Sequence, residues 1–142
     1  MKNQRVIFAK RPLGEPDNDC FRFDEIDVPE LEDNQILVKV CWLSLDPYMR
    51  GRMNDGKSYA DPMQIGDVMT GESSGIIVKS TSDKFAVGDY VAVHKGWQSY
   101  VVCGADDERL MKIDITNGTL SAHLGVVCLL YTSDAADDVR CV

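Results

Sequence analysis

Short apolar runs, many of them alternating with polar residues, dominate the first two thirds of the chain. Such period-two runs, rich in β-branched and aromatic residues, predict β-strands. We expect strands at residues 5–9, 21–28, 35–45, 68–70, 75–78, 90–93, 100–102 and 110–113. The run over 35–45 is almost continuously apolar, which predicts a central strand covered on both faces. Short strands at this spacing are typical of a β-barrel or sandwich.

Several segments interrupt this pattern. Glycine, Asn-Asp-Gly and Asp-Pro sequences predict an exposed loop over 51–65, after one helical turn at 47–50. The segment 85–89 carries a glycine turn that leads into a strand. Near the end of the chain, Thr119 can cap a short helix, because apolar residues follow it at helical spacing. Those residues are Leu120, Leu124 and Val127.

Composition and charge place the chain among ordinary globular proteins. Its 142 residues suit one domain, and 44% of them are hydrophobic and 27% charged. The net charge of -8 would repel a phosphate backbone, so we expect no nucleic-acid partner. No apolar run approaches the ~20 residues that span a bilayer, and the N-terminus lacks a signal-peptide core. We therefore expect a soluble, cytoplasmic protein with no membrane partner.

The cysteines and histidines form no recognisable metal or redox motif. The five cysteines lie at least thirteen residues apart, which excludes a zinc knuckle and a CxxC pair. We favour free thiols in a reducing compartment over a disulfide framework. His94 and His123 have no ligand partner at the right spacing, so we expect both to be structural or solvent-exposed. Phosphate-binding glycine motifs are also absent, so we do not expect this chain alone to bind a nucleotide.

The most distinctive stretch is Leu43–Met53, where an apolar strand ends and Pro47 starts a turn. In that turn Tyr48 offers a flat apolar face that suits a conjugated carbonyl compound, and Arg50 and Arg52 could hold a carboxylate or phosphate. The alternative is purely structural. Tyr48 and Met49 would then fill the core, and the arginines would be solvated or paired with Asp46 and Asp55.

This stretch and three later ones resemble the N-terminal domain of the zinc-independent medium-chain dehydrogenase/reductases. The four segments are Leu43–Met53, Gly66–Met69, Phe85–Asp89 and Gly96–Tyr100. Within that group the chain is most similar to the NADPH-dependent alkenal/one double-bond reductases, which include prostaglandin and curcumin reductases. The resemblance implies a mainly β fold, a GroES-like, partly open β-barrel with short helices, over residues 1–127. In complete members a Rossmann domain follows.

Two further features follow from the resemblance. Zinc-dependent relatives carry a cysteine where this chain has Leu43 and a histidine where it has Gly71, so no catalytic zinc is expected. After residue 126 the sequence departs from the family. Residues 128–142 resemble translated sequencing adapter, which makes them a foreign or disordered tail and leaves the Rossmann domain missing. The alternative is a genuine short helix capped by Ser133.

The resemblance implies an NADPH-dependent reductase of the C=C bond of α,β-unsaturated ketones and aldehydes. This chain would form the substrate-side wall of the cleft, with NADPH bound mainly by the missing domain and a small enone or enal as partner. Pro47, Tyr48 and Met49 would line the pocket for substrate and nicotinamide, with Arg50 and Trp97 as neighbours. No catalytic residue is assigned, and the parent protein could form a homodimer. The alternative is a non-catalytic GroES-like binding module that presents the loop 54–62 to a partner.

Overall fold

The computed structural model describes residues 1–56 and 61–124. The predicted helix residue Val127 and the tail at 128–142 lie outside these residues, as do residues 57–60 of the predicted loop. The division into a domain over 1–127 and a foreign tail therefore stays a prediction.

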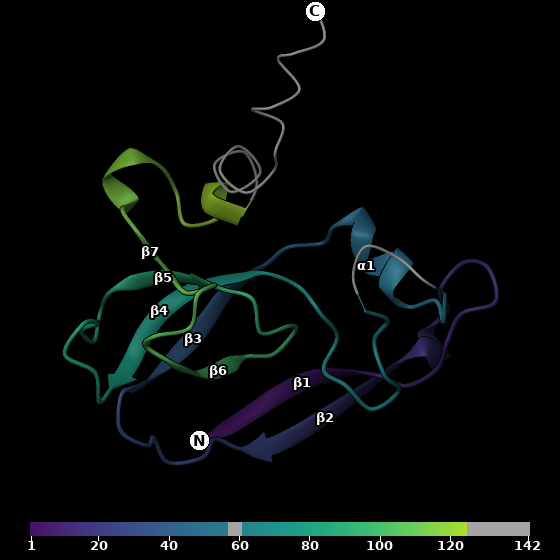
Figure 1. Cartoon of the computed structure of the whole chain (residues 1–142), viewed down its shortest axis with the longest axis horizontal. Helices are drawn as coiled ribbons and strands as arrows, with labels where there is room; N and C mark the ends of the chain where they lie inside the picture. The colour runs from purple at the N-terminus through teal and green to yellow at the C-terminus, as the bar shows by residue number, and fades with distance from the viewer. Residues whose placement is uncertain (57–60, 125–142) are drawn as a thin grey trace, which may run out of the picture.

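The described residues form two antiparallel sheets with short helical turns between strands (Figure 1). Strands β1 (Lys2–Phe8) and β2 (Phe21–Asp27) form a hairpin. The second sheet has the order β6-β3-β4-β5-β7. Its members are β3 (Gln35–Leu43), β4 (Ser73–Ser80), β5 (Tyr90–Val93), β6 (Tyr100–Gly104) and β7 (Met111–Ile113). The helical turns are η1 (Asn18–Cys20), α1 (Pro47–Arg52), η2 (Ile115–Asn117) and η3 (Ala122–Leu124).

Strand β1 joins the two sheets. On the edge of β1 that faces away from β2, the Val6 carbonyl accepts a hydrogen bond from the Met69 amide at 2.7 Å. The Val6 amide donates to the Trp97 carbonyl at 3.0 Å. The Ser99 amide also donates to the Gln4 carbonyl at 2.9 Å. These bonds join the two sheets only in part, because β1 makes isolated bridges along this edge and no continuous ladder. The predicted mainly β, partly open barrel with short helices is confirmed.

The core consists of two clusters of buried apolar side chains. The first covers the five-stranded sheet and contains Ile36, Val38, Ile77, Val91, Val93, Val101 and Cys103. The second lies under α1 and contains Phe8, Met49, Met53, Met63 and Met69. Methionine adapts to irregular space, so the second cluster can fill the gap between the hairpin, α1 and the loop that follows it.

Most of the predicted strands are confirmed, but residues 68–70 are not a strand. Val68 makes a single bridge to Ile7 instead. The prediction of a central β3 covered on both faces is wrong for its second half, where Trp42 is 54% exposed. The physical reason is that β6 pairs with β3 only as far as Lys39, so β3 runs on beyond its neighbour. The middle strand of the sheet is β4.

The loop predicted over 51–65 is partly helical and partly buried. Helix α1 extends to Arg52, and Met53 and Met63 are each only 3% exposed, so the prediction of an exposed loop is wrong at both methionines. Arg11 holds this segment down, because its guanidinium donates to the carbonyls of Met53 and Met63 at 2.9 Å each. A side chain distant in sequence therefore orders a loop that local breakers predict to be exposed.

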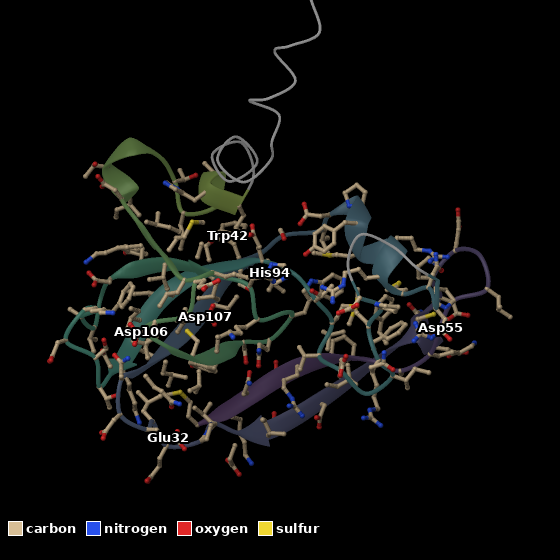
Figure 2. The ribbon with its side chains drawn as sticks, in the orientation of Figure 1. Glu32, Trp42, Asp55, His94, Asp106 and Asp107 are labelled. Atoms are coloured by element: carbon tan, nitrogen blue, oxygen red, sulfur yellow. The ribbon has the colours of Figure 1, made fainter. Side chains whose placement is uncertain are left out.

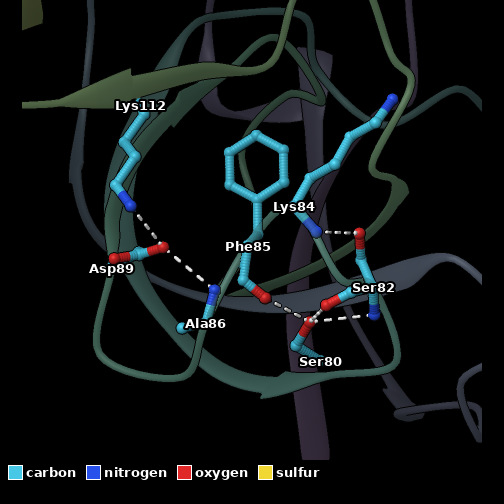
Figure 3. Close-up of polar contacts among 7 residues, drawn as sticks. All are labelled: Ser80, Ser82, Lys84, Phe85, Ala86, Asp89 and Lys112. Carbon is cyan, nitrogen blue, oxygen red and sulfur yellow. Dashed lines mark hydrogen bonds and ion pairs between the residues drawn. The ribbon is translucent and has the colours of Figure 1, made fainter.

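The glycine turn over 85–89 is confirmed (Figure 3). The Asp89 carboxylate accepts from the Ala86 amide at 2.9 Å and from the Lys112 ammonium at 2.8 Å. Both donors hold the pKa of Asp89 below its ordinary value, Lys112 most strongly. Gly88 has φ = 96°, a left-handed conformation that glycine adopts without strain. The Ser80 hydroxyl donates to the Phe85 carbonyl at 2.7 Å and fixes the start of the turn.

Candidate functional site

Helix α1 begins where β3 leaves the sheet, and its sequence explains its position. Pro47 occupies the first turn, where its missing amide hydrogen costs no hydrogen bond and its fixed φ favours a helix. The helix then turns Met49 into the methionine cluster, where it is 4% exposed. Burial of Met49 anchors a helix of only six residues, which would be unstable on its own.

A hollow of about 330 Å³ lies beside α1. Four of the five residues predicted to line the pocket, Pro47, Met49, Arg50 and Trp97, border it. The other lining residues are Pro16, Phe21, Leu45, Asp46, Met53 and Met69. The lining is therefore mostly apolar, with one carboxylate and one guanidinium at its border, as is usual for a small-molecule site.

Tyr48, the fifth predicted residue, lies on a different side of α1. Its ring stacks on the His94 ring, with centroids 6.4 Å apart and planes inclined by 26°. Its hydroxyl is buried and has no hydrogen-bond partner among the described residues, although Thr70 lies near it. Burial raises the pKa of Tyr48, and the charges of Asp46 and Glu72 act in the same direction. Tyr48 is therefore a neutral phenol whose hydroxyl points inward.

A polar network surrounds the Tyr48 hydroxyl. The Arg52 guanidinium donates to the Thr70 hydroxyl oxygen at 3.1 Å. That oxygen lies 3.3 Å from Nε2 of His94. Nδ1 of His94 faces the Glu72 carboxylate at 4.0 Å. Burial lowers the pKa of His94, so the ring is neutral near pH 7. Figure 2 shows His94 between α1 and the sheet, at the side where Trp42 also lies.

The arginines of α1 are engaged with the protein's own groups. Arg50 donates to the Asn54 side chain at 2.8 Å and also to the Gly14 carbonyl. Arg52 donates to the Asp61 carbonyl at 3.1 Å as well as to Thr70. Asp55, the expected structural partner of these arginines, instead pairs with Arg11 at 3.5 Å. The reason is that Arg11 already lies over this loop through its bonds to the Met53 and Met63 carbonyls.

Trp97 reaches the hollow because two glycines allow it. Gly96 has φ = 81°, and its α-carbon is so close to the Met69 carbonyl that a Cβ would lie 2.4 Å from that oxygen. Gly71 lies against the indole, where a Cβ would meet Nε1 of Trp97 at 2.7 Å. The Trp97 ring also stacks on Phe21, with centroids 6.1 Å apart. Contacts with Gly71 and Phe21 therefore fix the Trp97 ring from two sides.

Sequence reasoning missed the network of Thr70, Glu72 and His94. It treated His94 as structural or exposed, because no partner lies near it in sequence. The pairing of Ser73 with Val93 in the β4–β5 ladder brings Glu72 beside His94. That register could not be known from the sequence, so no local signal pointed to this network.

Residues 1–56 and 61–124 contain neither a candidate metal site nor a membrane-spanning helix. In this part of the chain no three His, Cys, Asp or Glu side chains gather as a metal site would require. None of its helices has the length and apolar character needed to cross a bilayer.

The comparison with known proteins decides the family. Residues 4–113 match the family described as the N-terminal domain of oxidoreductase. The chain belongs to this family. Its relatives include the NADPH-dependent curcumin reductase of Escherichia coli (strain K12), 40% identical over 126 residues, which are 89% of this chain and 36% of that protein. The resemblance predicted from the sequence is therefore confirmed.

Other relatives of this oxidoreductase N-terminal domain agree. The 2-alkenal reductase (NADP(+)-dependent) of Nicotiana tabacum is 30% identical over 132 residues, 89% of this chain and 38% of that protein. CurA from Vibrio vulnificus superposes with a TM-score of 0.80 at 37% identity, over 87% of this chain and 36% of CurA. CurA has also been solved in complex with NADPH. The GroES-like fold is confirmed, and the chain spans little more than a third of the length of these relatives.

Proposed function

We propose that the protein to which this domain belongs is an NADPH-dependent reductase of the C=C bond of α,β-unsaturated ketones and aldehydes. In this proposal the domain forms the substrate-side wall of the cleft, and a small enone or enal is the partner. The observation that carries the proposal is the apolar hollow beside α1, in a chain whose relatives are named as NADPH-dependent reductases. A flat conjugated skeleton needs such an apolar surface, with few polar groups to satisfy.

The described residues fit only one end of NADPH. They contain no strand, glycine turn and helix unit that could hold a pyrophosphate, and α1 has only six residues. The hollow offers apolar contact suited to a nicotinamide ring, so we assign the rest of NADPH to the part of the protein beyond this chain. When bound there, NADPH would supply a hydride for the β-carbon of the enone, and the α-carbon would take a proton from another source.

The domain's own contribution is to shape the site and to exclude water from it. Pro47, Met49 and Trp97 present apolar surface, which excludes water from the reacting carbons. Tyr48 does not border this hollow, and it remains a proposed substrate contact on the His94 side of α1, through its ring because its hydroxyl is buried. We assign no catalytic residue here, so the proton donor belongs to the rest of the protein or to solvent.

The site is proposed to work without zinc. The family's zinc-dependent members carry a histidine at the position of Gly71, and here the neighbouring Trp97 leaves no room for a side chain. Leu43, at the other ligand position, is an apolar residue that cannot bind a metal. These residues favour hydride transfer to an enone that is polarised by hydrogen bonds alone.

A fused protein tests the proposal. Residues 1–124 are joined to the part of the E. coli curcumin reductase that follows its aligned segment, and NADPH consumption is followed with an enone and with the matching saturated ketone. We expect consumption with the enone only. The donor segment alone serves as the control and should be inactive. Binding of NADPH without enone turnover, combined with capture of a partner that depends on residues 54–62, would favour the binding module instead.

A further inference from the structure

The proposed function does not use His94, although His94 is built into the site. It follows β5 directly, only 18% of its side chain is exposed, and it stacks on Tyr48, which belongs to a different element. Buried polar atoms normally have partners, and both ring nitrogens of His94 face polar side chains. Here one nitrogen faces a hydroxyl and the other faces a carboxylate.

The groups that face the two ring nitrogens of His94 favour a proton on Nδ1. A guanidinium can only donate, so the oxygen of Thr70 accepts the proton of Arg52 at 3.1 Å. The hydroxyl hydrogen of Thr70 is then available to Nε2 of His94, 3.3 Å away. Nε2 accepts this hydrogen when the ring proton is on Nδ1. Nδ1 faces the Glu72 carboxylate, which can only accept, so we assign the ring proton of neutral His94 to Nδ1.

The charges around His94 support a neutral ring. Arg52 lies on α1 and Arg109 lies in the segment before β7. Both disfavour a positive charge on the His94 ring. Glu72, before β4, and Asp46, before α1, act in the opposite direction. Burial is the largest influence, and it also disfavours the charged ring. A neutral ring can stack on the Tyr48 ring and accept from Thr70 at the same time.

We propose that His94 is a positioning residue of the enone pocket: as the neutral Nδ1–H tautomer, bonded to the Thr70 hydroxyl, it holds the ring of Tyr48 and thereby α1, whose Pro47 and Met49 border the hollow. The chain of contacts from α1 through Thr70 to His94 returns to α1 at Tyr48, so it braces the ring against rotation. This proposal rests on the proposed function, because it names what orients the same pocket.

The first experiment uses the 142-residue chain and needs no activity. ¹⁵N NMR of the imidazole nitrogens identifies the tautomer of His94, and a His123→Gln variant assigns the signals of the two histidines. We expect a fixed Nδ1–H tautomer at pH 7.5, which Thr70→Val converts to a mixture. A predominant Nε2–H tautomer, or spectra unchanged by Thr70→Val, would overturn the proposal.

The second experiment measures kinetics in the fused protein. His94→Phe keeps an aromatic ring against Tyr48 but loses the acceptor, and Thr70→Val loses the donor. Each should raise KM for the enone about fivefold, the value of one hydrogen bond, with KM for NADPH unchanged. The double variant should show no more than Thr70→Val alone, because that change already breaks the Thr70–His94 bond. Thr81→Val is the matched control, because it removes a hydroxyl that donates to the Glu32 carbonyl in a distant loop.

The outcomes separate this proposal from the proposed function. A double variant that raises KM by about 25-fold would mean that the two residues act independently, and it would overturn the positioning role. Unchanged KM in all three variants would overturn it as well. A fused protein that reduces no enone contradicts the proposed function, whereas the NMR experiment still decides how His94 is held. If the variants fail to fold, the tautomer of the unaltered chain alone decides.

Discussion

Replacing Gly71 by alanine tests the packing that holds the candidate site together. Gly71 is buried, and a Cβ there would lie 2.7 Å from Nε1 of Trp97 and 2.9 Å from Cε of Met49. Its φ lies outside the left-handed region, so the substitution adds volume without backbone strain. The Met49 methyl group can move aside. The Trp97 ring cannot do so easily, because it also stacks on Phe21.

The expected magnitude follows from two opposing effects. Forcing an extra methyl group into a packed core costs about 1–3 kcal/mol. Replacing glycine by alanine also restricts the unfolded chain, which returns about 0.5 kcal/mol. The net loss in the free energy of unfolding is then about 0.5–2.5 kcal/mol. At about 4 °C for each kcal/mol in a domain of this size, Tm should fall by about 2–10 °C.

Thermal melts of the 142-residue chain, followed by circular dichroism, measure this change. Gly51→Ala is the matched control, because Gly51 is exposed on α1 with nothing within 4 Å of a Cβ. Higher helix propensity should make that variant more stable by up to about 1 kcal/mol. The reasoning is refuted if Gly71→Ala melts at or above the temperature of the unaltered chain. Near-ultraviolet circular dichroism should also change for Gly71→Ala only, since the Trp97 ring must shift.

Three further predictions follow from the site. Calorimetric titration of the chain with NADPH should give a dissociation constant no better than about 1 mM, because no pyrophosphate site is present in the described residues, and a micromolar value would contradict this. In the fused protein, Tyr48→Phe should keep turnover within several-fold, whereas Tyr48→Ala should raise KM for the enone about tenfold or more by removing the ring. A ~100-fold loss of kcat in Tyr48→Phe would mean that the hydroxyl holds the developing enolate. Folding lowers the pKa of His94, so the unfolded chain binds the proton more tightly than the folded chain does. The stability that the neutral ring contributes is therefore complete above about pH 6.5, and it is lost as the pH falls below that value. Urea denaturation at pH 7.5 and pH 5 should show a smaller loss for His94→Gln than for the unaltered chain, and equal losses would contradict the assignment.

Local pattern was sufficient for most of the fold. Alternation predicted β1 and β2, and short runs rich in β-forming residues predicted β5 to β7; in β5, three of the four residues are buried. Local pattern failed where tertiary contacts decide burial. The apolar second half of β3 has the composition of a covered strand, yet Trp42 is exposed because β6 ends earlier. Met53 and Met63 follow strong loop signals, yet Arg11 and the methionine cluster bury them.

The candidate site was only partly predictable for a similar reason. The strand end at Leu43 and the proline turn were sufficient to predict a helical turn, and the family resemblance was needed to expect its residues at a pocket. Sequence could not decide which side of α1 each residue faces, and it left open whether Met49 fills the core or lines a pocket. In the structure Met49 does both. The network around His94 depends on the β4–β5 register, in which Ser73 pairs with Val93 and so brings Glu72 beside His94.

Isotope transfer tests the central claim most directly. The fused protein is given NADPH that carries deuterium at the transferable position, together with an aliphatic enone such as 3-nonen-2-one. The product is then analysed by mass spectrometry and NMR. The account predicts a saturated ketone with deuterium on the former β-carbon. An allylic alcohol with deuterium on the former carbonyl carbon, or no turnover of the enone, would contradict it.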